Sequence, residues 1–182
     1  MVPVGYMYKI VSSKPDWLET NQVSDIYSVS GCISEDFAEW IKYWKHNGYW
    51  FFDSPKVIED LAQEQNLSLK GMTLFFYLAY EWEWDTDEEQ WNLYSPEESF
   101  STDVVLPQNS KIEGYDIISF SFGNSAECSP LSCNSMAQKI KVNSHCLLDT
   151  FEQAMLILES GSFKNCEPGP YRIYEVHTIE NT

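Results

Sequence analysis

Hydrophobic and polar positions alternate most regularly over residues 73–85. The even positions from 74 to 84 are all apolar, whereas the odd positions change from largely apolar to acidic after Ala79. Because side chains of a strand point alternately to its two faces, this pattern predicts a long strand that is buried on both faces at its start and has one wet face at its end. A polar loop over 86–90 and an aromatic return over 91–94 predict that this strand continues into a hairpin.

Shorter runs of the same kind predict the other strands. They lie at 6–11, 115–122 and 171–179, with shorter extended or turn-like pieces at 25–32, 49–52 and 103–106. Proline, glycine and polar clusters predict loops or turns over 14–25, 95–114, 123–130 and 167–170.

Helical spacing predicts three to four helices. One is expected to begin at Ser34 and to end near 46–48, with an apolar stripe at i, i+3, i+4 and i+7. That stripe is Phe37, Trp40, Ile41 and Trp44. A second helix is expected from Ser54-Pro55, a cap followed by proline at the first helical position, to Asn66. Its predicted buried face is Val57, Ile58, Leu61 and Ala62.

Two further helices are expected in the last third of the chain. A short one is placed at 132–140. A clearer one is capped by Asp149 or Thr150, has apolar residues at 151, 154, 155 and 158, and stops before Gly161. Strands with hairpin-like neighbours, mixed with helices, favour an α+β fold with a mixed, mostly antiparallel sheet. The chain shows no repeat and no low-complexity linker, so we expect one domain over residues 1–182.

The charge balance narrows the classes of partner. Lys and Arg number 11 and Asp and Glu number 28, which gives a net charge of −17. Binding to nucleic acid or to an anionic membrane depends on Lys and Arg, so neither is expected. The one arginine, Arg172, could clamp a carboxylate or phosphate, or could pair with a surface glutamate. Aromatic residues make up 15% of the chain, which excludes disorder as its main state.

Half of the net charge lies in less than a quarter of the chain. Residues 71–110 contain nine acids and no base, hence −9, and the other 142 residues contain 19 acids and 11 bases, hence −8. The nine acids are Glu81, Glu83, Asp85, Asp87, Glu88, Glu89, Glu97, Glu98 and Asp103.

Three of these acids, Glu81, Glu83 and Asp85, are expected on one strand face with side chains about 7 Å apart. Carboxylates this close repel one another, and a basic partner would relieve the repulsion, so this face is a candidate docking surface for a basic protein. The alternative is a solvated strand edge that deters aggregation. The aromatic anchors of a docking surface would be Trp82, Trp84 and Trp91.

A thiol next to a predicted helix start suggests a different chemistry. Cys133 would lie in the first turn of the helix at 132–140, where the helix dipole lowers a thiol pKa, and His145 could act as its base, with His46 and His177 as other options. These two residues, Cys133 and His145, are therefore candidate catalytic residues of a Cys/His enzyme. The plainer interpretation is a capping Ser132 beside a small buried cysteine.

Metal and cofactor sites find little support in the spacing of the ligands. Cys128 and Cys133 have a spacing found in zinc sites, but His145 and Cys146 are adjacent and their side chains diverge. The acidic run over 85–90 lacks the glycine of a calcium loop. The common nucleotide-binding, hydrolase and zinc-protease motifs are absent from the sequence. We therefore expect no metal and no cofactor.

The cysteines and the N-terminal segment suggest a compartment. Five cysteines form an odd set, and the chain begins without a basic segment followed by an apolar run. No stretch of about 18 apolar residues is present to span a membrane. We expect reduced thiols and a cytoplasmic location; the oligomeric state is not indicated.

Three motifs resemble a family of small, uncharacterised bacterial proteins. They are Ser-Pro-Leu-Ser-Cys-Asn at 129–134, His-Cys-Leu-Leu-Asp-Thr-Phe-Glu-Gln-Ala at 145–154 and Glu-Pro-Gly-Pro-Tyr-Arg at 167–172. No activity comes with this family, so the resemblance assigns no functional residue. In size, acidity and aromatic content the chain is also similar to immunity proteins that neutralise bacterial toxins.

The sequence thus predicts an acidic protein-binding module, in concrete form an immunity-type inhibitor of a basic toxin or nuclease. Two alternatives stay open. One is the Cys/His enzyme; the other is a DNA mimic, which requires acids spaced like phosphates over a long surface.

Overall fold

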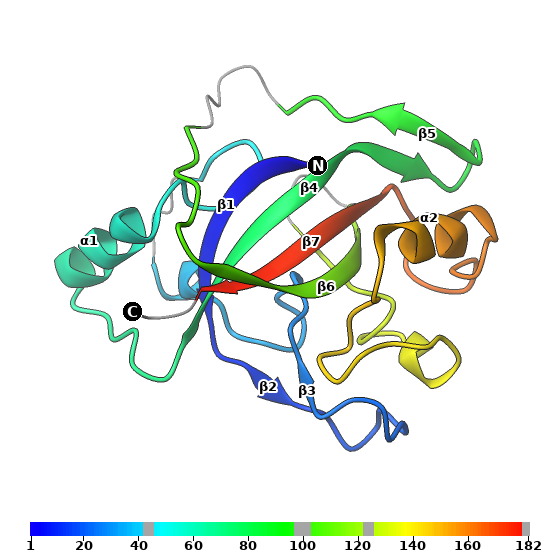
Figure 1. The fold of residues 1–182 in the computed structure, drawn as a ribbon, viewed down its shortest axis with the longest axis horizontal. Coiled ribbons are helices and arrows are strands. Elements are labelled where there is room, and N and C mark those ends of the chain that lie inside the picture. The colour runs from blue at the N-terminus through cyan, green and yellow to red at the C-terminus, as the bar shows by residue number, and fades with distance from the viewer. Residues whose placement is uncertain (42–45, 97–102, 122–125, 180–182) are drawn as a thin grey trace.

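The long alternating segment forms strand β4, Thr73–Asp85, at the bounds predicted for it. The computed structural model describes residues 1–41, 46–96, 103–121 and 126–179. In it, β4 pairs with β1 (Val2–Lys9), β5 (Gln90–Leu93) and β7 (Tyr171–Ile179), and β6 (Ser110–Ser119) pairs with β7. All these pairs are antiparallel and give the order β1-β4-β7-β6 (Figure 1).

One edge of β4 is shared by two strands. β1 pairs with β4 residues 73–79 and β5 with residues 82–85, while β7 occupies the opposite edge. A bulge between Ala79 and Glu83 shifts the register against β7 at the point where β1 ends and β5 begins. A separate two-stranded sheet joins β2 (Ser12–Ser13) to β3 (Asp25–Ile26).

Two of the predicted helices form with the predicted caps. Helix α1, Pro55–Gln65, begins after Ser54, whose side chain accepts from the Val57 amide, and ends at left-handed Asn66. Helix α2, Phe151–Glu159, begins after Thr150, whose side chain accepts from the Gln153 amide. The buried face of α1 consists of Ile58 and Ala62, with Leu61 partly buried; Val57, predicted to be buried, is exposed.

The prediction of the other two α-helices is wrong, because neither forms among the described residues. In place of the first there is a 3-10 helix, Phe37–Trp40, followed by extended Ile41; Trp44 lies outside the described residues. It starts at Asp36, not at Ser34, because the Asp36 carboxylate accepts from the Ala38 amide. Further on, the Asn47 side chain accepts from the amides of Tyr49 and Phe51 and fixes a tight turn instead of a helix end.

In place of the helix at 132–140 there are turns and a 3-10 helix, Met136–Gln138, preceded by Ser135 at a φ of 59°. The described residues therefore contain two α-helices, not three to four. Strand β6 begins at Ser110, inside the segment 95–114 that was predicted to be a loop. It starts with exposed polar residues, so it lacks the apolar alternation that marks a half-buried strand.

The two faces of the sheet are covered differently. On one face, Phe75 packs against Tyr27 and Tyr77 packs against Phe51, so loops cover it, with ring centroids 5.1 and 4.8 Å apart. On the other face, Phe151 of α2 packs against Tyr80 with a centroid separation of 4.9 Å. Figure 1 places α1 and α2 at opposite ends of the sheet. The α+β class and the mostly antiparallel sheet are thus confirmed; one domain over residues 1–182 stays a prediction.

Candidate functional site

The β4–β5 hairpin carries the acids and tryptophans that the sequence singled out. Trp82 lies opposite Leu93, and Trp84 lies opposite Trp91, so all four share one face of the hairpin. Glu83 lies on the other face, opposite Asn92. The hairpin therefore has an apolar face and an acidic face, as its period of two requires.

The acids of the hairpin are not equally available. Glu83 accepts from Nε of Arg172 at 2.8 Å, and Arg172 is buried with its guanidinium over the rings of Tyr94 and Phe120 at 3.4 and 3.9 Å from their centroids. Glu83 therefore serves to neutralise a buried cation. Glu81 is exposed.

The turn of the hairpin uses some of its own carboxylates. Oδ1 of Asp85 accepts from the amides of Asp87 and Glu88 at 2.9 and 3.0 Å. Glu88 accepts from the Gln90 side chain, and Glu89 lies 3.8 Å from the ammonium of Lys164. Asp87, Glu88 and Glu89 are nevertheless exposed. The Glu97 and Glu98 of the acidic run lie outside the described residues.

Among the three tryptophans of the hairpin, Trp82 is exposed, whereas Trp84 and Trp91 pack against each other. Trp82 is 40% exposed and its partner Leu93 is 59% exposed, so this cross-strand pair offers apolar surface to solvent. Trp84 packs edge-on against Trp91 at 5.3 Å, and Nε1 of Trp91 donates to Glu159 at 3.0 Å. Of the three predicted anchors, Trp82 is the one on an open surface.

A cavity of about 420 Å³ lies between the hairpin turn and the segment that runs from the end of α2 to β7. Its charged lining consists of Asp87 and Glu89 from the turn and of Glu159, Lys164 and Glu167 from the opposite wall. Four carboxylates thus surround one ammonium among the described lining residues. The apolar part of the lining is Trp84, Leu158, Phe163 and Tyr171, with further contributions from Cys166 and Pro168.

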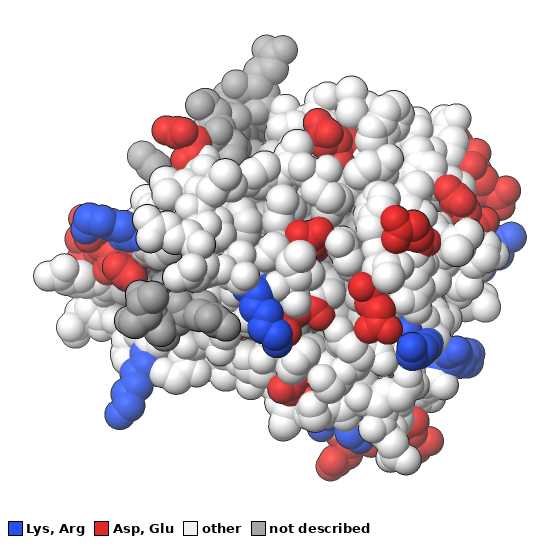
Figure 2. Space-filling view, in the orientation of Figure 1, with Lys and Arg blue, Asp and Glu red and all other residues white. Residues whose placement is uncertain are grey.

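The surface charge is uneven on the face shown in Figure 2. Acidic side chains form several separate groups there, and one of the largest lies at the edge where the hairpin turn is seen in Figure 1. Basic side chains lie beside some of these groups. A DNA mimic needs a long unbroken series of carboxylates; this face offers separated groups, and the DNA-mimic alternative stays a prediction.

The candidate catalytic residues Cys133 and His145 have separate partners. Nδ1 of His145 lies 2.5 Å from Oδ1 of Asp25, its Nε2 lies 3.7 Å from Glu113, and its ring stacks on Tyr27 at 4.0 Å. Cys133 lies in a turn and groups with two other cysteines. Because no α-helix begins at residue 132, the expected cause of a low thiol pKa at Cys133 is missing.

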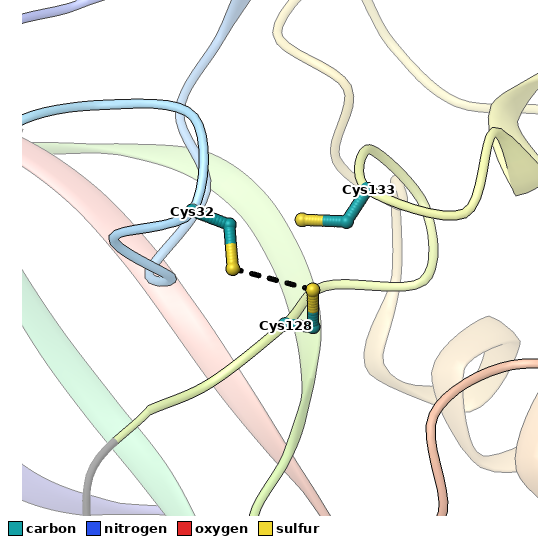
Figure 3. A group of neighbouring side chains, drawn as sticks. All are labelled: Cys32, Cys128 and Cys133. Atoms are coloured by element: carbon teal, nitrogen blue, oxygen red, sulfur yellow. Dashed lines mark hydrogen bonds between the residues drawn. The ribbon is translucent and has the colours of Figure 1, made fainter.

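The cysteine partners of Cys133 are Cys32 and Cys128, and the three sulfurs lie within 4.8 Å of one another. Figure 3 shows the three side chains converging, Cys32 from one loop and Cys128 and Cys133 from another segment. The Sγ atoms of Cys32 and Cys128 are 3.3 Å apart. Cys32 is exposed, and the other two are half-buried. We call these three residues the thiol cluster.

Ionisation in the thiol cluster centres on Cys32. Its pKa is lowered to about 5, chiefly because the Cys133 thiol donates a hydrogen bond to it, although burial and the Glu127 carbonyl oxygen 2.9 Å from its sulfur favour the thiol. Burial raises the pKa of Cys128 to about 12. The hydrogen bond to Cys32 raises that of Cys133. The low thiol pKa thus belongs to Cys32, whereas the sequence placed it on Cys133.

The zinc set considered from the sequence is split in the structure. Cys128 and Cys133 do lie together, but Cys146 is buried in the apolar core around α2, and His145 pairs with Asp25. Cys32 is the residue that sequence reasoning missed. It lies 96 positions before Cys128, and no local spacing motif connects residues so far apart.

No helix among the described residues is long and apolar enough to cross a membrane. Comparisons of the chain with models of protein families, with curated proteins and with solved structures found no match.

Proposed function

We propose that this chain is an acidic protein-binding module whose contact surface is the end of the β4–β5 hairpin together with the adjoining cavity. We call this the hairpin surface. Its exposed side chains include Trp82 and Leu93 on the apolar face, Glu81 on the acidic face, and Asp87, Glu88 and Glu89 in the turn. The observation that carries the proposal is the cavity of about 420 Å³ with four carboxylates in its lining, next to an exposed Trp-Leu pair.

The chemistry of the hairpin surface fits a basic partner. A lysine or arginine side chain has an apolar stem and a cationic head, so its stem can lie against Trp84 and Pro168 while its head meets the carboxylates of Asp87, Glu89 and Glu159. The exposed pair Trp82 and Leu93 supplies an apolar centre, and acidic groups around it steer a positively charged protein to the surface. Apolar anchors with a charged rim are typical of protein interfaces.

In its most concrete form the proposal is an immunity-type inhibitor that acts in the cytoplasm. The module would cover a basic surface of a toxin or nuclease, the kind of surface with which such an enzyme binds anionic substrate. Inhibition would be steric and electrostatic and would require no catalytic residue of this chain.

The most specific test reverses the charge of acidic residues whose side chains do not hold the fold together. Glu83 neutralises Arg172 and Asp85 holds the turn, so their replacement would disturb the fold as well as the charge. Glu81 and Asp87 are exposed, and their replacement by lysine reverses charge on the hairpin surface alone. The matched control is Glu19→Lys with Glu64→Lys, two exposed positions away from the hairpin.

The experiment captures partners from a bacterial lysate on immobilised wild-type chain and then titrates the purified partner by calorimetry. We expect E81K/D87K to weaken the affinity for that partner by about tenfold or more, and the wild-type affinity to fall as salt is added. The control E19K/E64K should bind within about twofold of wild type. Equal affinity of E81K/D87K and wild type would remove the hairpin surface as the contact.

A further inference from the structure

The thiol cluster lies outside the hairpin surface and has a chemistry of its own. It is the one group of three or more His, Cys, Asp or Glu side chains among the described residues whose ligand atoms lie close enough to share an ion. Its three sulfurs come from two regions of the chain, one sulfur from the loop at residue 32 and two from the segment 128–133.

A buried carboxylate connects the two regions. Asp116 on β6 is fully buried, and its Oδ2 accepts from the Ser28 hydroxyl and the Val29 amide at 2.8 and 2.9 Å. Its Oδ1 accepts from the Ser129 hydroxyl at 2.6 Å and from the Ile117 amide at 2.9 Å. One side chain of the sheet thus fixes the segment before Cys32 and the residue after Cys128.

A buried ammonium supports the same loop from the other side. Nζ of Lys9 on β1 donates to the carbonyl oxygens of Ser28, Val29 and Ser30 at 2.9, 2.9 and 2.8 Å. Lys9 is 2% exposed, so its three donors are spent on the backbone of one short loop. The positive Lys9 and the negative Asp116 therefore hold residues 28–30 between two strands of the sheet.

The backbone of each cysteine is also fixed by a hydrogen bond. The Cys32 amide donates to the Ser30 hydroxyl at 3.0 Å, and that hydroxyl donates to the Glu127 carbonyl. The Cys128 amide donates to the Ser119 hydroxyl at 3.3 Å, and the Cys133 amide donates to the Ser129 carbonyl at 2.8 Å. The backbone of each of the three cysteines is therefore anchored by a hydrogen bond that needs no ligand.

We propose that Cys32, Cys128 and Cys133 form a binding site for one thiophilic metal ion, with Zn²⁺ as its reference ligand. Zinc binds thiolate sulfur at about 2.3 Å in tetrahedral geometry, which places neighbouring sulfurs about 3.8 Å apart. The sulfurs of Cys32 and Cys128 are 3.3 Å apart, and no pair in the cluster is more than 4.8 Å apart, so small side-chain rotations bring them to that spacing. Three thiolates leave a fourth position, and exposed Cys32 opens that position to solvent or to an external ligand.

The supporting shell is what makes this arrangement a site and not a chance grouping. Metal sites in proteins depend on outer hydrogen bonds that orient the ligands. Here, Asp116, Lys9 and the hydroxyls of four serines, Ser28, Ser30, Ser119 and Ser129, form such bonds in and around the ligand-bearing loops. A dithiol that only formed a disulfide would need two of these cysteines, whereas the structure brings together a third from a separate turn.

The test uses the full chain, reduced and free of metal. Co²⁺ is titrated into it, and the sulfur-to-cobalt charge-transfer band and tetrahedral d–d bands are followed before Zn²⁺ is added. We expect one equivalent of Co²⁺ to bind with thiolate charge transfer and to be displaced by Zn²⁺, because zinc is favoured by tetrahedral sulfur sites.

Serine variants assign the ligands. C32S, C128S and C133S should each weaken Zn²⁺ binding by about tenfold or more, whereas C166S, which removes a half-buried thiol outside the cluster, should bind like wild type. Circular dichroism of each variant shows whether it is folded.

A second measurement needs no variant. Zn²⁺ should slow the alkylation of Cys32, Cys128 and Cys133 in the wild-type chain, read by peptide mass spectrometry, and should leave that of Cys166 unchanged. Equal protection of all cysteines, or no Co²⁺ binding by fully reduced chain, overturns the proposal. The proposal is also overturned if a Cys32–Cys128 disulfide is the sole product that these thiols form. None of these outcomes bears on the hairpin surface.

Discussion

Glu175 on β7 is a carboxylate that the fold keeps charged. It accepts a hydrogen bond from the Tyr115 hydroxyl at 2.8 Å, and its Oε1 lies 2.6 Å from Nε2 of His177. The bond from His177 is the main reason that the pKa of Glu175 is lowered from its ordinary value of 4.5. Because the folded chain holds this proton less tightly than the unfolded chain, the carboxylate contributes stability above pH 4.5 and loses it as the pH falls through the folded pKa.

Replacement of this carboxylate should therefore have a pH-dependent effect. We expect Glu175→Gln to lower the free energy of unfolding by about 1–2 kcal/mol near pH 7, and we expect the difference from wild type to shrink below about pH 4. Urea unfolding at both pH values measures it, with exposed Glu64→Gln as the control, which should change stability by less than about 0.5 kcal/mol. A difference of the same size at both pH values would contradict this account.

At the scale of elements, the turn between β4 and β5 depends on one side chain. Oδ1 of Asp85 accepts from two successive turn amides, and Glu89 adopts a left-handed φ of 51° to complete the reversal. Removal of this acceptor leaves both amides to the solvent and weakens the pairing that follows.

We expect Asp85→Ala to cost about 1 kcal/mol and to loosen β5, because the hairpin loses the bonds that set its register. Hydrogen exchange at the Tyr94 amide, which donates to the Glu81 carbonyl, should become faster. Asp85→Asn keeps an oxygen acceptor and should retain slow exchange, which separates hydrogen bonding from charge. Asp60→Ala, in an exposed ion pair on α1, is the control; fast exchange in that variant too would argue against a role of the turn.

The elements that the sequence predicted well are those with local signals. Strands 73–85 and 171–179 were predicted at their observed bounds because alternation is strong there, and helices α1 and α2 because Ser54 and Thr150 act as caps. The segment after Ser34 has apolar residues at helical spacing, but Asp36 and Asn47 bind backbone amides in non-helical turns. Local side-chain bonds overrode the periodicity in that segment.

The candidate sites were predictable only where they are local. The acids and tryptophans of the hairpin are close in sequence, so alternation placed them on the correct faces. Glu83 pairs with Arg172 because of the register of β7 against β4. That register follows a bulge that no pattern in the sequence indicates. The thiol cluster depends on the pairing of strands, which brings Cys32 to Cys128 across 96 positions.

At the scale of the whole molecule, net charge opposes folding. The chain carries −17, and like charges repel more strongly in the compact state than in the expanded one. Added sodium chloride screens this repulsion over a Debye length that falls from about 14 Å at 0.05 M to about 4 Å at 0.5 M.

We therefore expect the Tm to rise by about 2–5 °C between about 0.05 and 0.5 M sodium chloride. The variant E19K/E64K carries −17 + 4 = −13 and should show a smaller rise. The experiment uses sodium chloride and not a sulfate salt, because sulfate also strengthens the burial of apolar groups. A Tm that stays constant or falls with salt would show that specific ion pairs outweigh the general repulsion.

The position of β7 has a consequence for the chain during its synthesis. Residues 171–179 leave the ribosome after every other strand among the described residues, yet they pair on both sides, with β4 and with β6. A nascent chain that has emerged only to residue 170 can already pair β1 and β5 with β4, but β4 and β6 still present open edges to each other. Open edges recruit foreign strands. A stalled or truncated product is thus the form of this protein most exposed to aggregation and to chaperones, and the closing strand ends that exposure in a single step.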